Sequence, residues 1–147
     1  MATFNKFNSF IAAVAAGTHA GCLNADTDVL KVYLTNAAPS ASADLLKADL
    51  AEIDMSNEAN HGAGGGDVQN AATQATFIIT VAGQDVTFLA SGGSVGPFRY
   101  AVLYNDTAAS DPLIGWWDRG SGSEVTLADG ESFVWDLPAT TIFTLGS

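Results

Sequence analysis

Residues 98–118 read FRYAVLYNDTAASDPLIGWWD, and this stretch decides the fold class. Apart from Arg99, the first seven residues are continuously apolar, which is typical of a central strand that is buried on both faces. A polar loop over 105–112 then returns the chain to a second apolar run at 113–118. Two such runs bounded by polar turn residues predict β-strands.

Further short strands are predicted on both sides of this stretch. They are 29–35, the two arms of a hairpin at 77–81 and 86–89, the runs 124–127 and 133–137 that flank an Asp-Gly turn, and 140–145. Residues 42–53 fit a short helix at least as well as two edge strands. About eight short strands separated by turn residues predict a mainly β fold, a β-sandwich or a jelly roll.

The N-terminal segment has a different periodicity. Phe4, Phe7 and Phe10 recur every three residues, which predicts one short amphipathic helix over about residues 4–16. Thr3 can cap its start and Gly17 can end it. Two roles remain open for this helix: it covers an open end of the β core, or it docks on a partner protein.

A second distinct segment lies over about residues 56–74. It holds four glycines within 62–66 and few large apolar residues, so we expect a long loop. The length of 147 residues predicts one domain over 1–147.

The charge balance excludes several classes of partner. Sixteen acidic residues against five basic ones give a net charge of −11. Binding to a phosphate backbone or to an anionic membrane surface needs clustered Lys and Arg, so we expect neither nucleic acid nor membrane as a partner. No apolar run approaches about 18 residues, and the N-terminal apolar run is interrupted by polar residues, so we expect neither a transmembrane span nor a cleaved signal peptide.

No pattern typical of a catalytic or metal site is visible in the sequence. His19 and His61 are far apart and are interpreted as surface loop histidines, and Cys22 as a small, half-buried thiol. The glycine cluster lacks the Lys-Ser/Thr ending of a phosphate-binding loop. We therefore expect a protein that is not an enzyme and that binds no cofactor and no metal.

Trp116 and Trp117 are the most distinctive pair. Neighbouring residues of a strand face opposite sides, so one ring can fill the core while the other faces a partner protein or a sugar ring. The alternative is that both rings are core. Arg99, in the most apolar strand, is expected to form a structural ion pair with Asp118 or Asp136.

Four segments resemble small structural proteins of tailed-bacteriophage and prophage virions. They are 2–7 (ATFNKF), 30–39 (LKVYLTNAAP), 90–106 (ASGGSVGPFRYAVLYND) and 111–118 (DPLIGWWD). The resemblance is greatest to capsid cement (decoration) proteins with a jelly-roll-like fold. The sequence departs from that family at 59–70 and at Pro138.

The resemblance implies a protein of the virion, assembled in the host cytoplasm and bound to the outer surface of the phage head, where it stabilises the lattice of the major capsid protein. The implied partners are the major capsid protein and further copies of this chain, as a homodimer or homotrimer. The candidate interface residues are Phe4, Phe7, Phe10, Trp116, Trp117 and Arg99. The alternatives are a tail or baseplate component of the same particle, and a lectin-like β-sandwich that binds glycans through Trp116 or Trp117 and Asp118.

Overall fold

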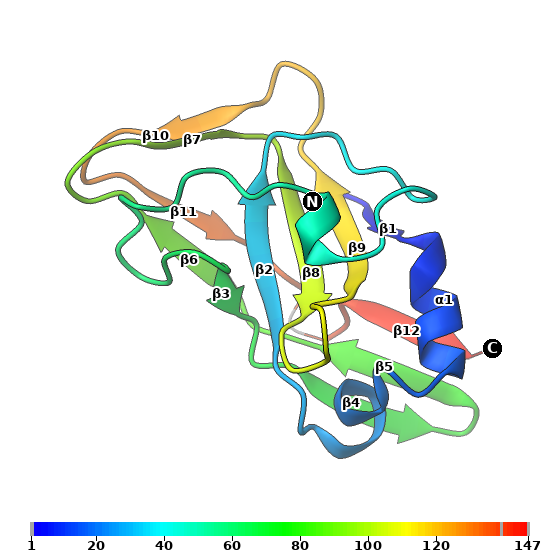
Figure 1. Ribbon diagram of the computed structural model, residues 1–147. Helices are drawn as coiled ribbons and strands as arrows, with labels where there is room; N and C mark the ends of the chain where they lie inside the picture. Colours follow the sequence, from blue (N-terminus) through cyan, green and yellow to red (C-terminus); the bar gives the residue numbers. More distant parts are fainter. Residues whose placement is uncertain (1, 139, 147) are drawn as a thin grey trace.

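The computed structural model describes residues 2–138 and 140–146 and is built mainly of β-strands, with one short α-helix (Figure 1). In chain order the elements are β1 (Phe4–Lys6), α1 (Asn8–Ala15), the π-helical turn η1 (Gly21–Ala25), β2 (Leu30–Thr35), the 3-10 turn η2 (Lys47–Asp49), β3 (Gly66–Asp67), β4 (Ala71–Ala75), β5 (Ile78–Ala82), β6 (Val86–Leu89), β7 (Val95–Phe98), β8 (Tyr100–Asn105), β9 (Leu113–Asp118), β10 (Val125–Leu127), β11 (Ser132–Trp135) and β12 (Phe143–Gly146). The expected mainly β, sandwich-like class is confirmed.

The strands form several antiparallel sheets. The largest has the order β1-β9-β8-β2-β3, and the others are β12-β5-β4, β11-β6 and β10-β7. All six residues of β8 are buried. Along it, Ala101 and Leu103 join the main apolar core, whereas Val102 and Tyr104 join a smaller cluster on the opposite face. The prediction of a central strand that is buried on both faces is confirmed for residues 100–104, whereas Phe98 ends β7 in another sheet.

The N-terminal prediction is partly wrong. Phe4–Lys6 is a strand paired with β9, and the helix begins only at Asn8, with no side chain capping its start. A spacing of three residues fits a helix, but Gly115 on β9 leaves room for the Phe4 ring and the Asn5 carbonyl, so the segment adds an edge strand instead. Gly17 follows the end of the helix with a φ of +80°, as a helix-ending glycine should.

The pairing predicted for residues 77–89 is also wrong. β5 pairs with β4 and β12, and β6 pairs with β11, so the two do not form a hairpin. The connection at Gly83 is buried, and Gln84 donates its backbone N–H to the Val68 carbonyl, which carries the chain between sheets. The segment 56–74, expected to be a loop, contains β3 and most of β4. β10 and β11 likewise flank the Asp129-Gly130 turn without pairing with each other.

Candidate functional site

The phenylalanines predicted to face a partner lie mostly in the core. Phe7 and Phe10 have no exposed surface. The Phe7 ring lies 4.6 Å from that of Trp116, and the Phe10 ring lies 5.3 Å from that of Phe143. The expected interface role is therefore corrected for both residues: they hold β1 and α1 against the chain's own sheets.

Phe4 and the tryptophan pair are also packed within the chain. Phe4 is half-buried, with its ring 4.9 Å from the Trp117 ring and 5.9 Å from the Phe143 ring. Trp117 is buried in the main core, which excludes it as a surface anchor. Trp116 faces the opposite side, as expected, and packs half-buried against the smaller cluster.

Arg99 forms the predicted structural ion pair. Its guanidinium donates from Nε and Nη2 to the two carboxylate oxygens of Asp118, at 2.7 and 2.8 Å, and lies over the Tyr100 ring. Asp118 also accepts the backbone N–H of Gly120. The hydrogen bonds from Arg99 lower the pKa of Asp118 and raise that of Arg99 itself. This pair fixes the ends of β8 and β9, since the two residues lie on adjacent segments of one sheet.

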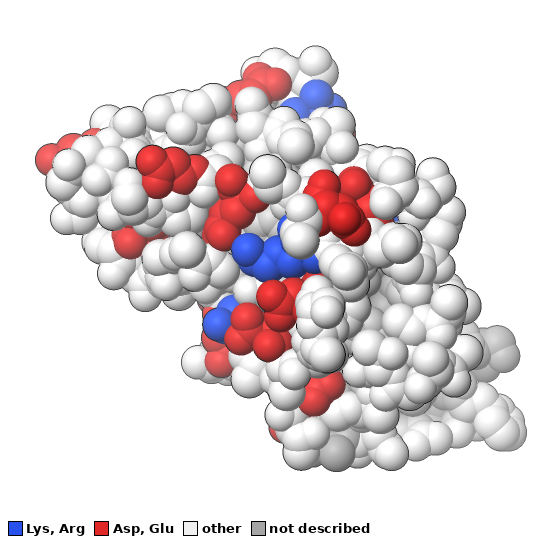
Figure 2. Space-filling model, in the orientation of Figure 1, with Lys and Arg blue, Asp and Glu red and all other residues white. Residues whose placement is uncertain are grey.

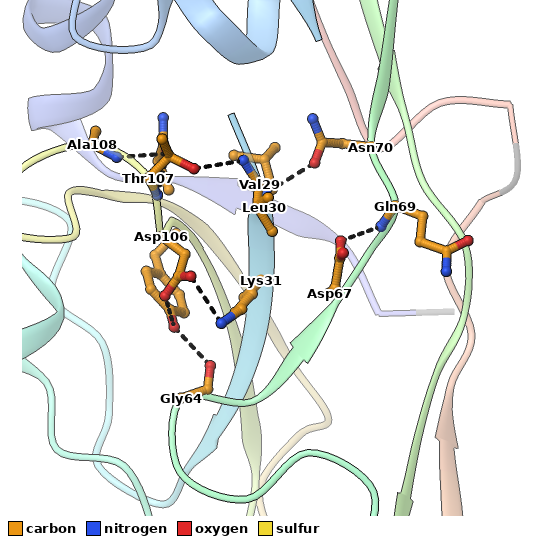
Figure 3. Close-up of polar contacts among 12 residues, drawn as sticks. Val29, Leu30, Lys31, Gly64, Asp67, Gln69, Asn70, Asp106, Thr107 and Ala108 are labelled. Carbon is orange, nitrogen blue, oxygen red and sulfur yellow. Dashed lines mark hydrogen bonds and ion pairs between the residues drawn. The ribbon is translucent and has the colours of Figure 1, made fainter. Parts of the chain in front are cut away.

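Polar contacts hold the glycine-rich segment against β2 and β8 (Figure 3). The Tyr104 hydroxyl donates to the Gly64 carbonyl at 2.7 Å, and Lys31 pairs with Asp106 at 2.8 Å. The Glu52 carboxylate accepts the backbone N–H of Gly64 and pairs with Lys47. These contacts explain how a segment with few apolar side chains adopts a defined path.

Glu58 is a buried acid that organises the same segment. Its carboxylate accepts backbone N–H groups from four residues: Asn60, His61, Gly62 and Leu89. Burial alone would raise the pKa of Glu58, but the four hydrogen bonds outweigh burial and lower it. The sequence offered no signal for this role, because each donor is a backbone group of a loop or strand edge.

His19 and Cys22 are buried, contrary to the prediction of a surface histidine and a half-buried thiol. The Nδ1 atom of His19 lies 3.3 Å from Nδ2 of Asn105, while its Nε2 has no partner among the described residues. Burial lowers the pKa of His19, against an opposing effect of Asp28. Burial also raises the pKa of Cys22 to about 12, so its thiol stays protonated and unreactive.

Among the residues that the structure describes, the large apolar side chain with the greatest exposure is Phe77, which was predicted to begin a strand. Phe77 is 79% exposed in the turn that joins β4 to β5, and the next residue, Ile78, is 38% exposed. The hairpin lies at the lower right of the molecule, away from the upright strands β2 and β8 (Figure 1). β5 is held on both sides, by β4 and β12, so Phe77 projects from a supported element.

The surface around these features is largely neutral, with scattered acids and few basic groups (Figure 2). Over residues 2–138 and 140–146, no group of three or more His, Cys, Asp or Glu side chains is arranged to hold a metal ion. None of the helices in that part of the chain is long and apolar enough to cross a membrane. Comparisons with protein-family models, with curated proteins and with solved structures gave no match.

Proposed function

We propose that this protein is a capsid cement protein, which binds the outer surface of a tailed-phage head and stabilises the lattice of the major capsid protein. The resemblance of its four sequence segments to virion structural proteins motivates the proposal. It acts by binding, as a homodimer or homotrimer on the capsid, and performs no catalysis. Many modest contacts repeated over the lattice add up to mechanical support.

The observation that carries the proposal is the exposed Phe77. An aromatic side chain can bury roughly 150–250 Å² at an interface, and aromatic residues are enriched among the residues that dominate binding energy. Exposed at 79%, Phe77 contributes little to the stability of its own fold. Ile78 widens the apolar surface beside it. We assign this turn, in place of the Phe4, Phe7 and Phe10 stripe, as the anchor on the capsid.

The charge of the chain agrees with this role. A net charge of −11 keeps free copies apart by self-repulsion before assembly. The same charge favours a capsid surface that is neutral or basic around the hydrophobic contact. Raising the salt concentration should therefore slow association with capsids more than it weakens the bound state.

The test compares Phe77→Ser with Leu45→Ser, a matched control at another exposed apolar residue, 48% exposed. Co-sedimentation with undecorated capsids should show binding by the wild type and by Leu45→Ser. Phe77→Ser should lose about 30-fold or more in affinity, the equivalent of about 2 kcal/mol, with an unchanged melting temperature. Equal binding by Phe77→Ser would refute the anchor, and absence of binding by the wild type would refute the function.

There are two alternative functions: a tail or baseplate component, and a lectin-like glycan-binding protein. A tail or baseplate component would share the same anchor chemistry and would sediment with tails instead of heads. The lectin-like alternative needed an exposed tryptophan, but Trp117 is buried and Trp116 packs against Phe7. No glycan platform of that kind is therefore part of the proposal.

A further inference from the structure

β11 presents one free backbone edge. In an antiparallel pair, residues directly opposite each other share the same hydrogen-bonding state. Thr87 and Leu89 of β6 direct their backbone groups away from β11, because the Thr87 carbonyl accepts Asn60 Nδ2 and the Leu89 N–H is donated to Glu58. Their register partners on β11, Val134 and Ser132, must therefore direct their own N–H and C=O away from β6.

No other described segment occupies that edge. The backbone hydrogen bonds between described segments include none that reaches Ser132 or Val134. The exposure of the side chains follows the same alternation along β11: Ser132 and Val134 are exposed, whereas Trp135 is buried. Val134 is 48% exposed. A free edge with an exposed β-branched residue can pair with another extended chain.

A cleft of about 460 Å³ is lined in part by residues of β11. Its lining consists of Phe133, Val134, Trp135 and Asp136, together with Ala2, Asp118 and Arg119. An added strand lying along β11 would place alternate side chains towards this cleft, because side chains alternate along a strand. Phe133, Val134 and Trp135 in this mixed lining supply a contact for an apolar side chain beside the backbone pairing.

The charged side chains around the edge of β11 determine which charge a pairing segment should carry. Glu131 and Asp136 flank β11 and are exposed, whereas Asp118 is already engaged by Arg99. Arg119, which also lines the cleft, lies over the Phe133 ring and donates to the Ser123 carbonyl. A second copy of this chain, at −11, would bring acid against acid. An extended segment with Lys or Arg beside apolar residues would be attracted.

We propose that the edge of β11 docks an extended, basic segment of a partner protein, which adds a strand to the β6-β11 ladder. Its carbonyl groups accept the N–H groups of Ser132 and Val134, and its N–H groups donate to their carbonyls. An apolar side chain enters the cleft and a neighbouring Lys or Arg meets Asp136. This inference does not depend on the capsid as partner, because it can be tested with a peptide alone.

The probe is a short capped peptide of alternating lysine and valine, with a glutamate–valine peptide as the matched control. In the free protein, the amides of Ser132 and Val134 should exchange with solvent faster than those of Phe133 and Trp135. At about 1 mM, the lysine–valine peptide should slow exchange at Ser132 and Val134 at least about tenfold, and the glutamate peptide should not. Val134→Pro should abolish this protection because proline has no N–H, while Val134→Thr should retain it.

Each other result counts against the proposal. An absence of protection, or protection that persists in Val134→Pro, would overturn the docking edge. Equal protection by the two peptides would overturn its preference for a basic partner. Protection that grows with protein concentration alone would identify a second copy as the occupant. If Val134→Pro does not fold, Asp136→Lys takes its place, and unchanged affinity for the lysine–valine peptide would then refute the proposal.

Discussion

Replacing Phe7 by Ala separates a core role for the N-terminal aromatics from an interface role. The Phe7 side chain is fully buried and packs in the smaller cluster with Tyr33, Val102 and Leu113. Truncating a buried phenylalanine costs about 3–5 kcal/mol, the lost burial plus the cavity left behind. With the unfolding entropy expected for a chain of this length, that cost lowers the melting temperature by about 10–16 °C.

The assay for Phe7→Ala is thermal unfolding followed by circular dichroism, with Ile11→Ala as the matched control. Ile11 lies on the same N-terminal segment but is 56% exposed, so its truncation should change stability by no more than about 0.5 kcal/mol. Below its melting transition, Phe7→Ala should still bind capsids, because the residue faces the core. A melting temperature equal to that of the wild type, or capsid binding lost by a fully folded Phe7→Ala, would refute this reasoning.

Three further predictions concern buried groups. Glu58→Gln should destabilise the protein by about 1–3 kcal/mol, because the side-chain NH2 group of Gln would face backbone N–H groups that now donate to the carboxylate. The folded pKa of Glu58 is lowered, so the difference in urea-unfolding free energy between wild type and variant should have its full value above about pH 4.3. That difference should shrink as the pH falls through the folded pKa. His19 has a lowered pKa, so the wild type should lose stability as the pH falls through about 6.5. His19→Gln should flatten that slope, and a slope equal to that of the wild type would contradict the assignment. Gly115→Ala should push β1 off β9, because the added methyl meets Phe4, and the β1 amides should then exchange faster; unchanged exchange would argue against this packing.

The sequence was sufficient to predict the elements whose signal is local. β2, β8 and β9 follow from apolar runs bounded by turn residues, and the Arg99–Asp118 pair follows from a cation that must find a partner beside an apolar strand. Pairing was harder to predict. The segment containing β5 and β6 looked like a hairpin, but the partner of each strand lies far away in the chain and is selected by packing between sheets.

The surface could be predicted least well. Phe4, Phe7 and Phe10 share a spacing that fits a helix facing a partner. Yet Phe4 packs beside Gly115, and Phe7 and Phe10 are buried in the apolar clusters of the fold. Phe77 has the residue type of a strand interior, but Thr76 adopts a φ of +58° and makes the turn there. Exposure depends on which strands pair, and local sequence does not determine that pairing.

The proposed place of this chain on the phage head can be tested by locating the chain in a density map of the intact virus particle. We expect density for the mainly β fold in many copies, arrayed over the outside of the head, with the β4–β5 turn and Phe77 against the major capsid protein. Density for the chain only on the tail or baseplate, or particles that lack the chain altogether, would contradict it.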